Sequence, residues 1–395
     1  MNALAILGGA PAFPEPVHVG RPNIGDRARL MERIEGVIDR RWLTNDGPLV
    51  HEFEEAIATM LGVPHCIAMC NGTVALEIAI RAAGLSGEVI VSPFTFVATA
   101  HALQWQAITP VFCDVDPGTH NIDPARVEEL ITPRTTGILG VHVWGRPAPV
   151  DELTRIAADH GLRLLFDAAH ALGCSTGGRM IGAFGTAEVL SFHATKVVNS
   201  FEGGAIATAD EGFADVARLM RNHGFADYDE VGHVGTNGKM SEIAAAMGLT
   251  SLESRDEFVA ANRRNYETYR AALEGIDGVK LLGYDSAESC NWQYVVIEVD
   301  DSAGLTRDEL QAVLWAENVL ARRYFFPGCH RMEPYRTLFP DVAERLPETE
   351  RLVQRVLALP TGTSMSTDAV TAVAGLVARA MRDAPRLRAA LRATV

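Results

Sequence analysis

Short apolar runs alternate with amphipathic stretches through the first 250 residues. Seven runs have the length and composition of strands, at residues 66–69, 88–93, 110–115, 137–145, 162–170, 187–193 and 203–210. Several, such as 88–91, are continuously apolar, which is typical of strands buried on both faces. The stretches at 74–84 and 150–161 have helical periodicity. This order predicts an α/β fold with a large, mostly parallel sheet covered by helices on both faces.

The pattern changes before and after this region. Between residues 25 and 62 it predicts two helices separated by a break at Asp46-Gly47-Pro48. After residue 250, a long charged helix over 252–275 leads into alternating strands and further helices, among them 305–319. We therefore expect a large domain over 1–250, including an N-terminal arm, and a smaller C-terminal α/β domain over 251–395.

Composition narrows the function classes. A net charge of −15 disfavours binding to nucleic acid, which requires clustered positive charge. The six cysteines are scattered, and the close pair Cys66 and Cys70 lacks a second pair or nearby histidines, so we expect reduced thiols and no metal site. The N-terminus lacks the features of a signal peptide and no run is long enough to span a membrane, which predicts a cytoplasmic protein.

Lysine is scarce, and one lysine stands at a chemically informative place. The chain has only Lys196, Lys239 and Lys280. Lys196 follows a predicted strand and precedes the Glu202-Gly-Gly204 turn. Ligands of parallel α/β sheets bind at the carboxyl ends of strands, and a lysine beside apolar groups there can lose its proton and attack an aldehyde. Taken alone, Lys196 is better explained as an ordinary exposed lysine, because most lysines are exposed.

A carboxylate stands at the end of another predicted strand. Asp167 follows the buried run Leu164-Leu-Phe166 and precedes His170. A cofactor that acts as an electron sink needs a protonated ring nitrogen, and a buried carboxylate in turn needs a cationic partner. Asp167 is therefore a candidate for that contact, although its position is also compatible with a helix N-cap.

Two further features fit a phosphorylated aromatic cofactor. Asn71-Gly72-Thr73 joins a strand to a helix, where backbone N–H groups can bind a phosphate, and Ser191 is a second hydroxyl candidate. Many strand–helix turns contain Gly-Thr, so this signal is weak by itself. Phe96 can stack on a pyridine ring, but packing in the core is an equally good explanation.

At this point the chain resembles the DegT/DnrJ/EryC1/StrS family of fold-type-I pyridoxal-phosphate (PLP) enzymes, the sugar aminotransferases. The matching stretches occur in order along nearly the whole chain. They are residues 42–48, 71–76, 93–99, 167–170, 191–196, 202–204, 221–224 and 235–237, together with Ser241-Glu242, Pro327 and His330.

The resemblance implies a role for each candidate residue. Lys196 would form the Schiff base with PLP, Asp167 would contact the pyridine nitrogen, and Phe96 would stack on the ring. His170, at a position where many relatives carry glutamine, would lie near the ring hydroxyl. The residues that hold the phosphate would be Gly72, Thr73 and Ser191, with Asn237 of a neighbouring subunit, which implies a homodimer. Some relatives with histidine at the lysine position are dehydratases, so Lys196 favours transamination.

The implied reaction transfers an amino group from L-glutamate to a nucleotide-linked keto-deoxy sugar of the dTDP-4-keto-6-deoxyhexose type, with C4 favoured over C3, in deoxysugar or antibiotic biosynthesis. Arginines that could contact the diphosphate are Arg221, Arg322 and Arg323, the last two beside Tyr324. Alternatives within the family are an aminocyclitol aminotransferase and an aminohydroxybenzoate synthase. An alternative of another class is a non-catalytic regulatory relative.

The chain lacks the motifs of other nucleotide-binding proteins and of metal-dependent enzymes. Gly235-Thr-Asn-Gly-Lys239 resembles part of a P-loop, but its spacing is wrong. The chain has no G-x-G-x-x-G between an early strand and helix, and no H-E-x-x-H.

Overall fold

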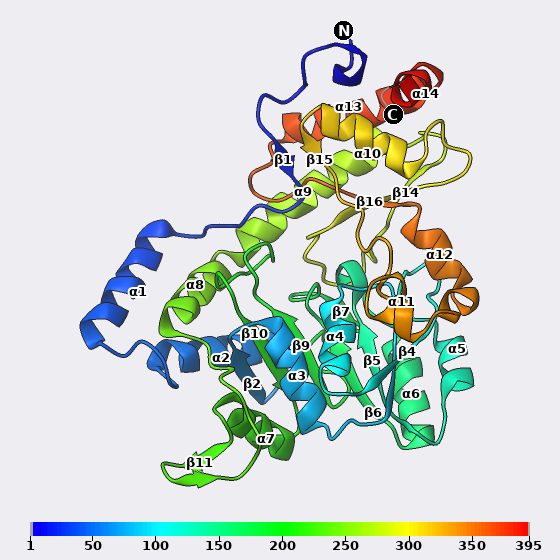
Figure 1. The fold of residues 1–395 in the computed structure, drawn as a ribbon. Coiled ribbons are helices and arrows are strands. Elements are labelled where there is room, and N and C mark those ends of the chain that lie inside the picture. Colours follow the sequence, from blue (N-terminus) through cyan, green and yellow to red (C-terminus); the bar gives the residue numbers. More distant parts are fainter. Residues whose placement is uncertain (1–2, 394–395) are drawn as a thin grey trace.

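A twisted seven-stranded sheet forms the centre of the larger part of the molecule. The computed structural model describes residues 3–393, and Figure 1 shows this sheet in the lower half of the molecule. The strands lie in the order β2 (His65–Met69), β10 (Gly204–Thr208), β9 (Ala187–Ser191), β6 (Arg163–Asp167), β5 (Thr135–Val141), β3 (Glu88–Val91) and β4 (Thr109–Phe112). Only β10 runs antiparallel to its neighbours, so the prediction of a mostly parallel sheet is confirmed.

Helices cover both faces of this sheet, because each buries one apolar side. One face packs against α1 (Arg27–Arg40), α2 (Pro48–Leu61), α5 (Pro124–Val127), α6 (Val150–His160) and α8 (Glu242–Glu253). The other packs against α3 (Gly72–Ala82), α4 (Ala98–Gln104) and α7 (Glu211–Arg221). Two hairpins project from the rim, β7–β8 (Ser175–Thr176, Arg179–Met180) and β11–β12 (Phe225–Asp227, Glu230–Val231). The break expected at residues 46–48 precedes α2, which starts at Pro48.

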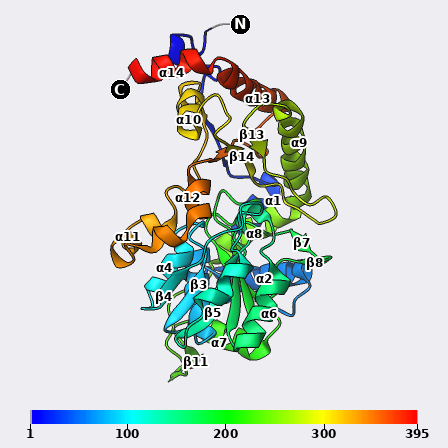
Figure 2. The same cartoon turned by 90° about the vertical axis from the view of Figure 1, so that its right-hand side faces the viewer.

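The smaller part is built on a three-stranded antiparallel sheet, β13 (Val279–Leu281), β14 (Val295–Val299) and β16 (Val356–Leu359). Its helices are α9 (Arg255–Leu273), α10 (Arg307–Ala316), α13 (Thr367–Arg382) and α14 (Ala384–Ala393). Figure 2 shows this part stacked on the large sheet. The single charged helix expected over 252–275 is α9, which begins after Ser254, where α8 ends.

Two segments cross the proposed boundary at residue 250. At the N-terminus, β1 (Val17–His18) pairs with β15 (Val319–Leu320), and Leu4 is buried in the core of the smaller part. Conversely, residues 329–346, including α11 (Tyr335–Leu338), pack into the core of the large sheet, and α12 (Pro347–Val353) leads back to β16. The N-terminal arm therefore packs against the smaller, C-terminal part, although it was expected to belong to the large domain. That residue 250 separates the two domains remains a proposal, which applies to the large sheet and the small sheet.

No helix within residues 3–393 combines the length and apolar character needed to cross a bilayer. Within the same residues, no group of three or more histidine, cysteine or acidic side chains is arranged to hold a metal ion.

Candidate active site

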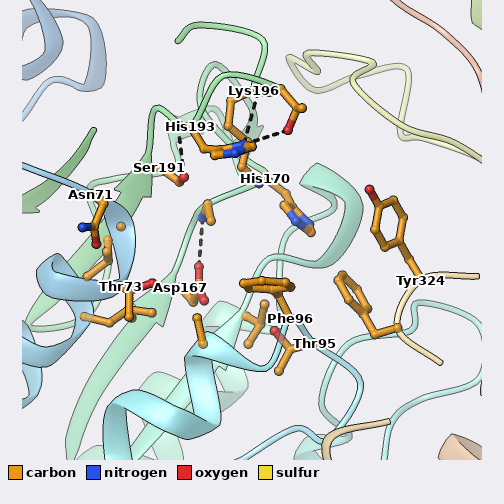
Figure 3. A pocket seen from close by; sticks show the side chains of 18 of the residues that line it. Asn71, Thr73, Thr95, Phe96, Asp167, His170, Ser191, His193, Lys196 and Tyr324 are labelled. Atoms are coloured by element: carbon orange, nitrogen blue, oxygen red, sulfur yellow. Dashed lines mark hydrogen bonds between the residues drawn. The ribbon is translucent and has the colours of Figure 1, made fainter. Parts of the chain in front are cut away.

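A cavity of about 300 Å³ lies at the carboxyl ends of β5, β6 and β9. The N-terminus of α3, the loop before α4 and residues of the smaller part close its other sides. Figure 3 shows the side chains that line it. Seven of the residues predicted from the sequence meet there: Gly72, Thr73, Phe96, Asp167, His170, Ser191 and Lys196. Residues up to 124 positions apart in the chain therefore form one site because parallel strands bring their carboxyl ends to the same edge.

Lys196 is placed on a turn that follows β9. Its backbone N–H donates to the carbonyl of His193 at 2.8 Å, and the side chain reaches into the cavity (Figure 3). Burial of the amine lowers the pKa of Lys196 to about 8, and the negative charge of Asp167 partly opposes this shift. About a tenth of the amine is therefore unprotonated at pH 7, far more than for a lysine with an ordinary pKa, and this form is the one that a nucleophile and a proton acceptor require.

Asp167 ends β6 and is 6 % exposed. Its Oδ2 accepts a hydrogen bond from the hydroxyl of Thr99 at 2.8 Å, and its Oδ1 accepts one from the backbone N–H of Ala169 at 3.0 Å. The residues after it form turns, so the alternative of a helix N-cap does not apply. No arginine or lysine within residues 3–393 forms an ion pair with this buried carboxylate. A buried carboxylate needs a cationic partner, and a protonated ring nitrogen in the cavity would supply one.

The start of α3 forms a cup for a phosphate. The Asn71 side chain caps the helix by accepting from the N–H of Val74 at 2.8 Å, while the N–H groups of Gly72 and Thr73 precede any intrahelical acceptor. A Cβ on Gly72 would stand 3.2 Å from Cβ of Ser191, so glycine keeps that hydroxyl close to the helix end. A Cβ on Gly204 would stand 2.6 Å from the Asn71 carbonyl carbon, so a side chain on β10 would push the cup away. The donor set fits a phosphate dianion.

Phe96 and His170 supply aromatic and hydrogen-bonding groups. Phe96 is 59 % exposed and faces the cavity, so the alternative that it packs in the core does not apply. The phenylalanine that packs in the core is Phe94. Nδ1 of His170 accepts from the backbone N–H of Trp144 at 3.3 Å. Burial, aided by the positive charge of Lys196, holds the pKa of His170 well below its usual value. The imidazole is therefore neutral with its proton on Nε2, and it can donate one hydrogen bond to an oxygen of a ligand.

A buried chain of hydrogen bonds extends from this position. The indole N–H of Trp144 donates to Nδ1 of His120 at 3.2 Å, and Nε2 of His120 lies 3.0 Å from the carboxylate of Glu298 on β14. Because an indole can only donate, His120 must carry its proton on Nε2 and donate it to Glu298. This chain ties the loop beside His170 to the smaller sheet.

The cavity also contains residues that the sequence did not single out as site residues. They are Thr95, His193, Glu202, Tyr294 and Phe325. Arg322, which the sequence did name as a candidate contact for the diphosphate, also lines the cavity at the side of the smaller part, together with its neighbour Tyr324. Thr99 lies behind Asp167, and its place in the motif 93–99 was the only sequence signal for it. Tyr294 and Phe325 had no such signal, because only the packing of the two parts brings them to the site.

Three other predicted residues do not line this cavity. Asn237 is exposed on a loop whose backbone pairs with Asn222, and it does not line the cavity of its own chain. Arg221 is buried in ion pairs with Asp46 and Glu54, so the idea that it contacts a diphosphate at the cavity mouth is wrong. Arg323 is 3.0 Å from Asp308 and lies outside the cavity, whereas Arg322 lines it.

Comparison with known proteins agrees with this geometry. The model of the DegT/DnrJ/EryC1/StrS aminotransferase family matches residues 25–378. A dTDP-4-amino-4,6-dideoxy-D-glucose transaminase of Escherichia coli is 35% identical over 362 residues, 91% of this chain and 98% of that protein. A GDP-perosamine synthase of Caulobacter vibrioides is 36% identical over 335 residues, 82% of this chain and 88% of that protein.

Among solved structures, DesI in the presence of its TDP-sugar product superposes with a TM-score of 0.93 at 49% identity, covering 98% of this chain and 99% of that one. The match extends over both parts of the molecule. The chain therefore belongs to the DegT/DnrJ/EryC1/StrS aminotransferase family and is a pyridoxal-phosphate-dependent transaminase.

Proposed function

We propose that this transaminase transfers an amino group from L-glutamate to C4 of a nucleotide-linked 4-keto-6-deoxyhexose. The observation that carries the proposal is the Lys196 amine, with its pKa lowered to about 8, in the same cavity as the buried carboxylate of Asp167. The similarity to transaminases that act on such sugars supports the substrate class, and the name of the E. coli relative supports C4.

Each residue of the site has a chemical task. Pyridoxal phosphate, when bound, supplies an electron sink for the carbanion at the amino-acid α-carbon. Lys196 would carry the cofactor, and its amine would take the α-proton of the amino acid as a base and return a proton as an acid. The buried carboxylate of Asp167 would keep the ring nitrogen protonated, and Nε2 of His170 would donate to the ring hydroxyl. Gly72, Thr73 and Ser191 would hold the phosphate.

Arg322 is the cation best placed to select the two substrates. It lines the cavity, and no ion pair within residues 3–393 neutralises its side chain. Its backbone is held to β16 by two hydrogen bonds with Ala358, at 3.0 and 2.8 Å. Glutamate and the sugar nucleotide occupy the site in alternate half-reactions, so one guanidinium serves the carboxylate of the first and the diphosphate of the second.

The functional unit in this proposal is a homodimer. Asn237 is exposed and its side chain makes no hydrogen bond within the described part of the chain, which suits a residue that reaches into a partner's phosphate cup. Exposed apolar residues occur after α1, in the loops around residues 201 and 234, on β11 and β12, and at the start of α8: Trp42, Leu43, Phe201, Phe225, Val231, Val234 and Ile243. Contact with a second subunit would remove such apolar side chains from water.

Turnover with a panel of acceptors tests the reaction. The PLP-loaded protein is mixed with L-glutamate and, in turn, a dTDP-4-keto-6-deoxyhexose, its 3-keto isomer and a keto-cyclitol, and 2-oxoglutarate release is followed. We expect release beyond the single equivalent of the first half-reaction only with the keto-sugar nucleotides, and fastest with the 4-keto compound. Preference for the keto-cyclitol would replace the proposal by the aminocyclitol alternative. A protein that takes up no PLP would support the non-catalytic alternative instead.

A further inference from the structure

A loop of the smaller part is fastened to two turns of the active site. We call residues 288–294, which lead into β14, the clamp loop. Its Asn291 side chain donates to the carbonyl of His170 at 2.8 Å. Oε1 of Gln293 accepts from the backbone N–H of Val197 at 3.1 Å. The clamp loop therefore holds the turn after β6 and the turn after β9, both of which line the cavity.

Two cysteines come together where the clamp loop meets the turn after β6. The backbone N–H of Ser175 donates to the carbonyl of Ser289 at 3.1 Å, and the N–H of Ser289 donates to the hydroxyl of Ser175 at 2.8 Å. The Asn291 side chain reaches carbonyls further back on the turn, so the two segments run in opposite directions. The residue before Ser175 and the residue after Ser289 therefore form the next pair, and these residues are Cys174 and Cys290.

The side chains of this pair point toward each other. A Cβ on Gly145 would stand 3.2 Å from Sγ of Cys174 and 3.3 Å from Oδ1 of Asn291, so the Cys174 sulfur is directed at the clamp loop. The Cys174 thiol donates a hydrogen bond to the sulfur of Cys290. That sulfur also accepts from the backbone N–H of Trp292 at 3.3 Å. The two sulfurs are therefore in direct contact.

The two thiols differ in reactivity. The hydrogen bond from Cys174 lowers the pKa of Cys290, and Cys290 is only half-buried, so it supplies the thiolate that an oxidant meets. Donation of that bond, together with burial, holds the pKa of Cys174 well above its usual value, and Cys174 is 1 % exposed. A reagent therefore reacts first at Cys290, and Cys174 reacts second with the product.

We propose that Cys174 and Cys290 are an oxidation site, at which a low-molecular-weight disulfide converts the two thiols into a disulfide that joins the clamp loop to the turn after β6. The Cys290 thiolate attacks one sulfur of the reagent, forms a mixed disulfide and releases one reagent thiolate, which takes a proton from water. Cys174 then attacks the Cys290 sulfur, and its proton goes to the second reagent thiolate as that group leaves. Two protein thiols are oxidised, and one reagent disulfide is reduced to two thiols.

The cross-link has a mechanical consequence. The structure describes the reduced state, because all six cysteines are free thiols. In the oxidised state a covalent bond closes the long stretch of chain between positions 174 and 290, which restricts the unfolded state. It also ties the loop that leads into the smaller sheet to the large domain beside the cavity. The oxidised protein is therefore more resistant to thermal unfolding than the reduced protein.

Mass spectrometry after treatment with oxidised glutathione tests the site. The PLP-loaded protein is incubated with the reagent and digested without reduction, and we expect a cross-linked peptide that contains Cys174 and Cys290. Cys174→Ala lacks the second thiol and should retain one glutathione on Cys290. The matched control is Cys70→Ser, which removes the other half-buried cysteine and should cross-link like wild type. Wild-type protein that keeps glutathione on Cys290 without a cross-link to Cys174 would overturn the proposal.

Thermal melting tests the consequence. We expect oxidised wild-type protein to melt about 4 °C or more above the reduced protein, and dithiothreitol to reverse the shift. Cys290→Ser, which cannot form the bond, should melt at the same temperature with and without the reagent. A cross-linked protein that melts no higher than the reduced protein would contradict the proposed fastening of the clamp loop.

Discussion

The hydroxyl of Thr99 donates a 2.8 Å hydrogen bond to Oδ2 of Asp167, on the side of the carboxylate opposite to its contact with Ala169 N–H. The hydroxyl of Thr95 lies 3.0 Å from that of Thr99. A hydroxyl has one proton to donate, so Thr95 donates to Thr99 when Thr99 donates to the carboxylate. This short chain, from the loop before α4 and the first turn of α4, fixes the orientation of Asp167.

Thr99→Val should impair catalysis without unfolding the protein. It removes a hydrogen bond to a buried charged group, worth about 1.5–3 kcal/mol, so we expect kcat/KM to fall about tenfold or more. Thr99→Ser keeps the hydroxyl and is the matched control, expected within about threefold of wild type. Steady-state kinetics at fixed glutamate measures both. Equal kinetics for Thr99→Val and wild type would show that Asp167 needs no support from this side.

Lys196→Ala should abolish steady-state turnover and the visible absorbance of the lysine-bound cofactor, because no other described lysine lines the cavity. The control is Lys280→Ala, since Lys280 is exposed on β13 and does not line the cavity. We expect wild-type rates and spectrum for this control. Turnover by Lys196→Ala at more than a trace level would contradict the assignment of Lys196 as the Schiff-base residue.

The rate of PLP uptake by cofactor-free protein should rise with pH around a midpoint near 8. The unprotonated amine is the nucleophile, and burial lowers the pKa of Lys196 to about 8, so the reactive fraction grows as pH passes through that value. Because the charge of Asp167 raises this pKa, Asp167→Asn should move the midpoint to lower pH while losing most steady-state activity. Stopped-flow absorbance across pH 6–10 provides the measurement, and a midpoint near that of a free lysine, about 10.4, would refute the prediction.

Two substitutions of His170 should distinguish the effect of losing its hydrogen bond from the effect of losing its ring packing. Phenylalanine keeps the ring packing against Phe325 and Trp144 but cannot donate, so His170→Phe should lower kcat/KM by about tenfold or more. His170→Gln retains an N–H donor and should keep more activity than His170→Phe. The absorbance of the bound cofactor, titrated with pH, gives a second measurement that reports on the ring hydroxyl directly. Similar values for the two variants would argue against a hydrogen bond from His170.

Mixed dimers test whether Asn237 acts on the partner subunit. Lys196→Ala and Asn237→Ala chains, co-expressed with different tags, form a mixed dimer in which one site has both wild-type residues only if Asn237 is supplied in trans. We expect each homodimer to be inactive or strongly impaired and the purified mixed dimer to recover about half of wild-type activity, since one of its two sites is intact. If Asn237 serves its own chain, the mixed dimer will show no recovery.

Much of the molecule follows from local patterns in the sequence. The parallel sheet is evident from continuous apolar runs such as residues 88–91, because a strand buried on both faces tolerates few polar side chains. Lys196 and Asp167 are identifiable for a related reason. Asp167 ends an apolar strand and Lys196 lies on the turn after another, at the carboxyl edge of the sheet, where a buried ionisable residue is costly unless it serves a ligand.

The remaining features depend on contacts between distant segments. Arg322 and Tyr294 belong to the site only because the smaller part packs over the carboxyl edge of the large sheet. Nothing in the local sequence pattern distinguishes Arg322 from Arg221. Arg322 nevertheless lines the cavity without an ion pair among the described residues, whereas Arg221 forms ion pairs with Asp46 and Glu54. Local periodicity reports which side of a strand or helix is buried, whereas the partner of a charged side chain is set by the packing of whole elements.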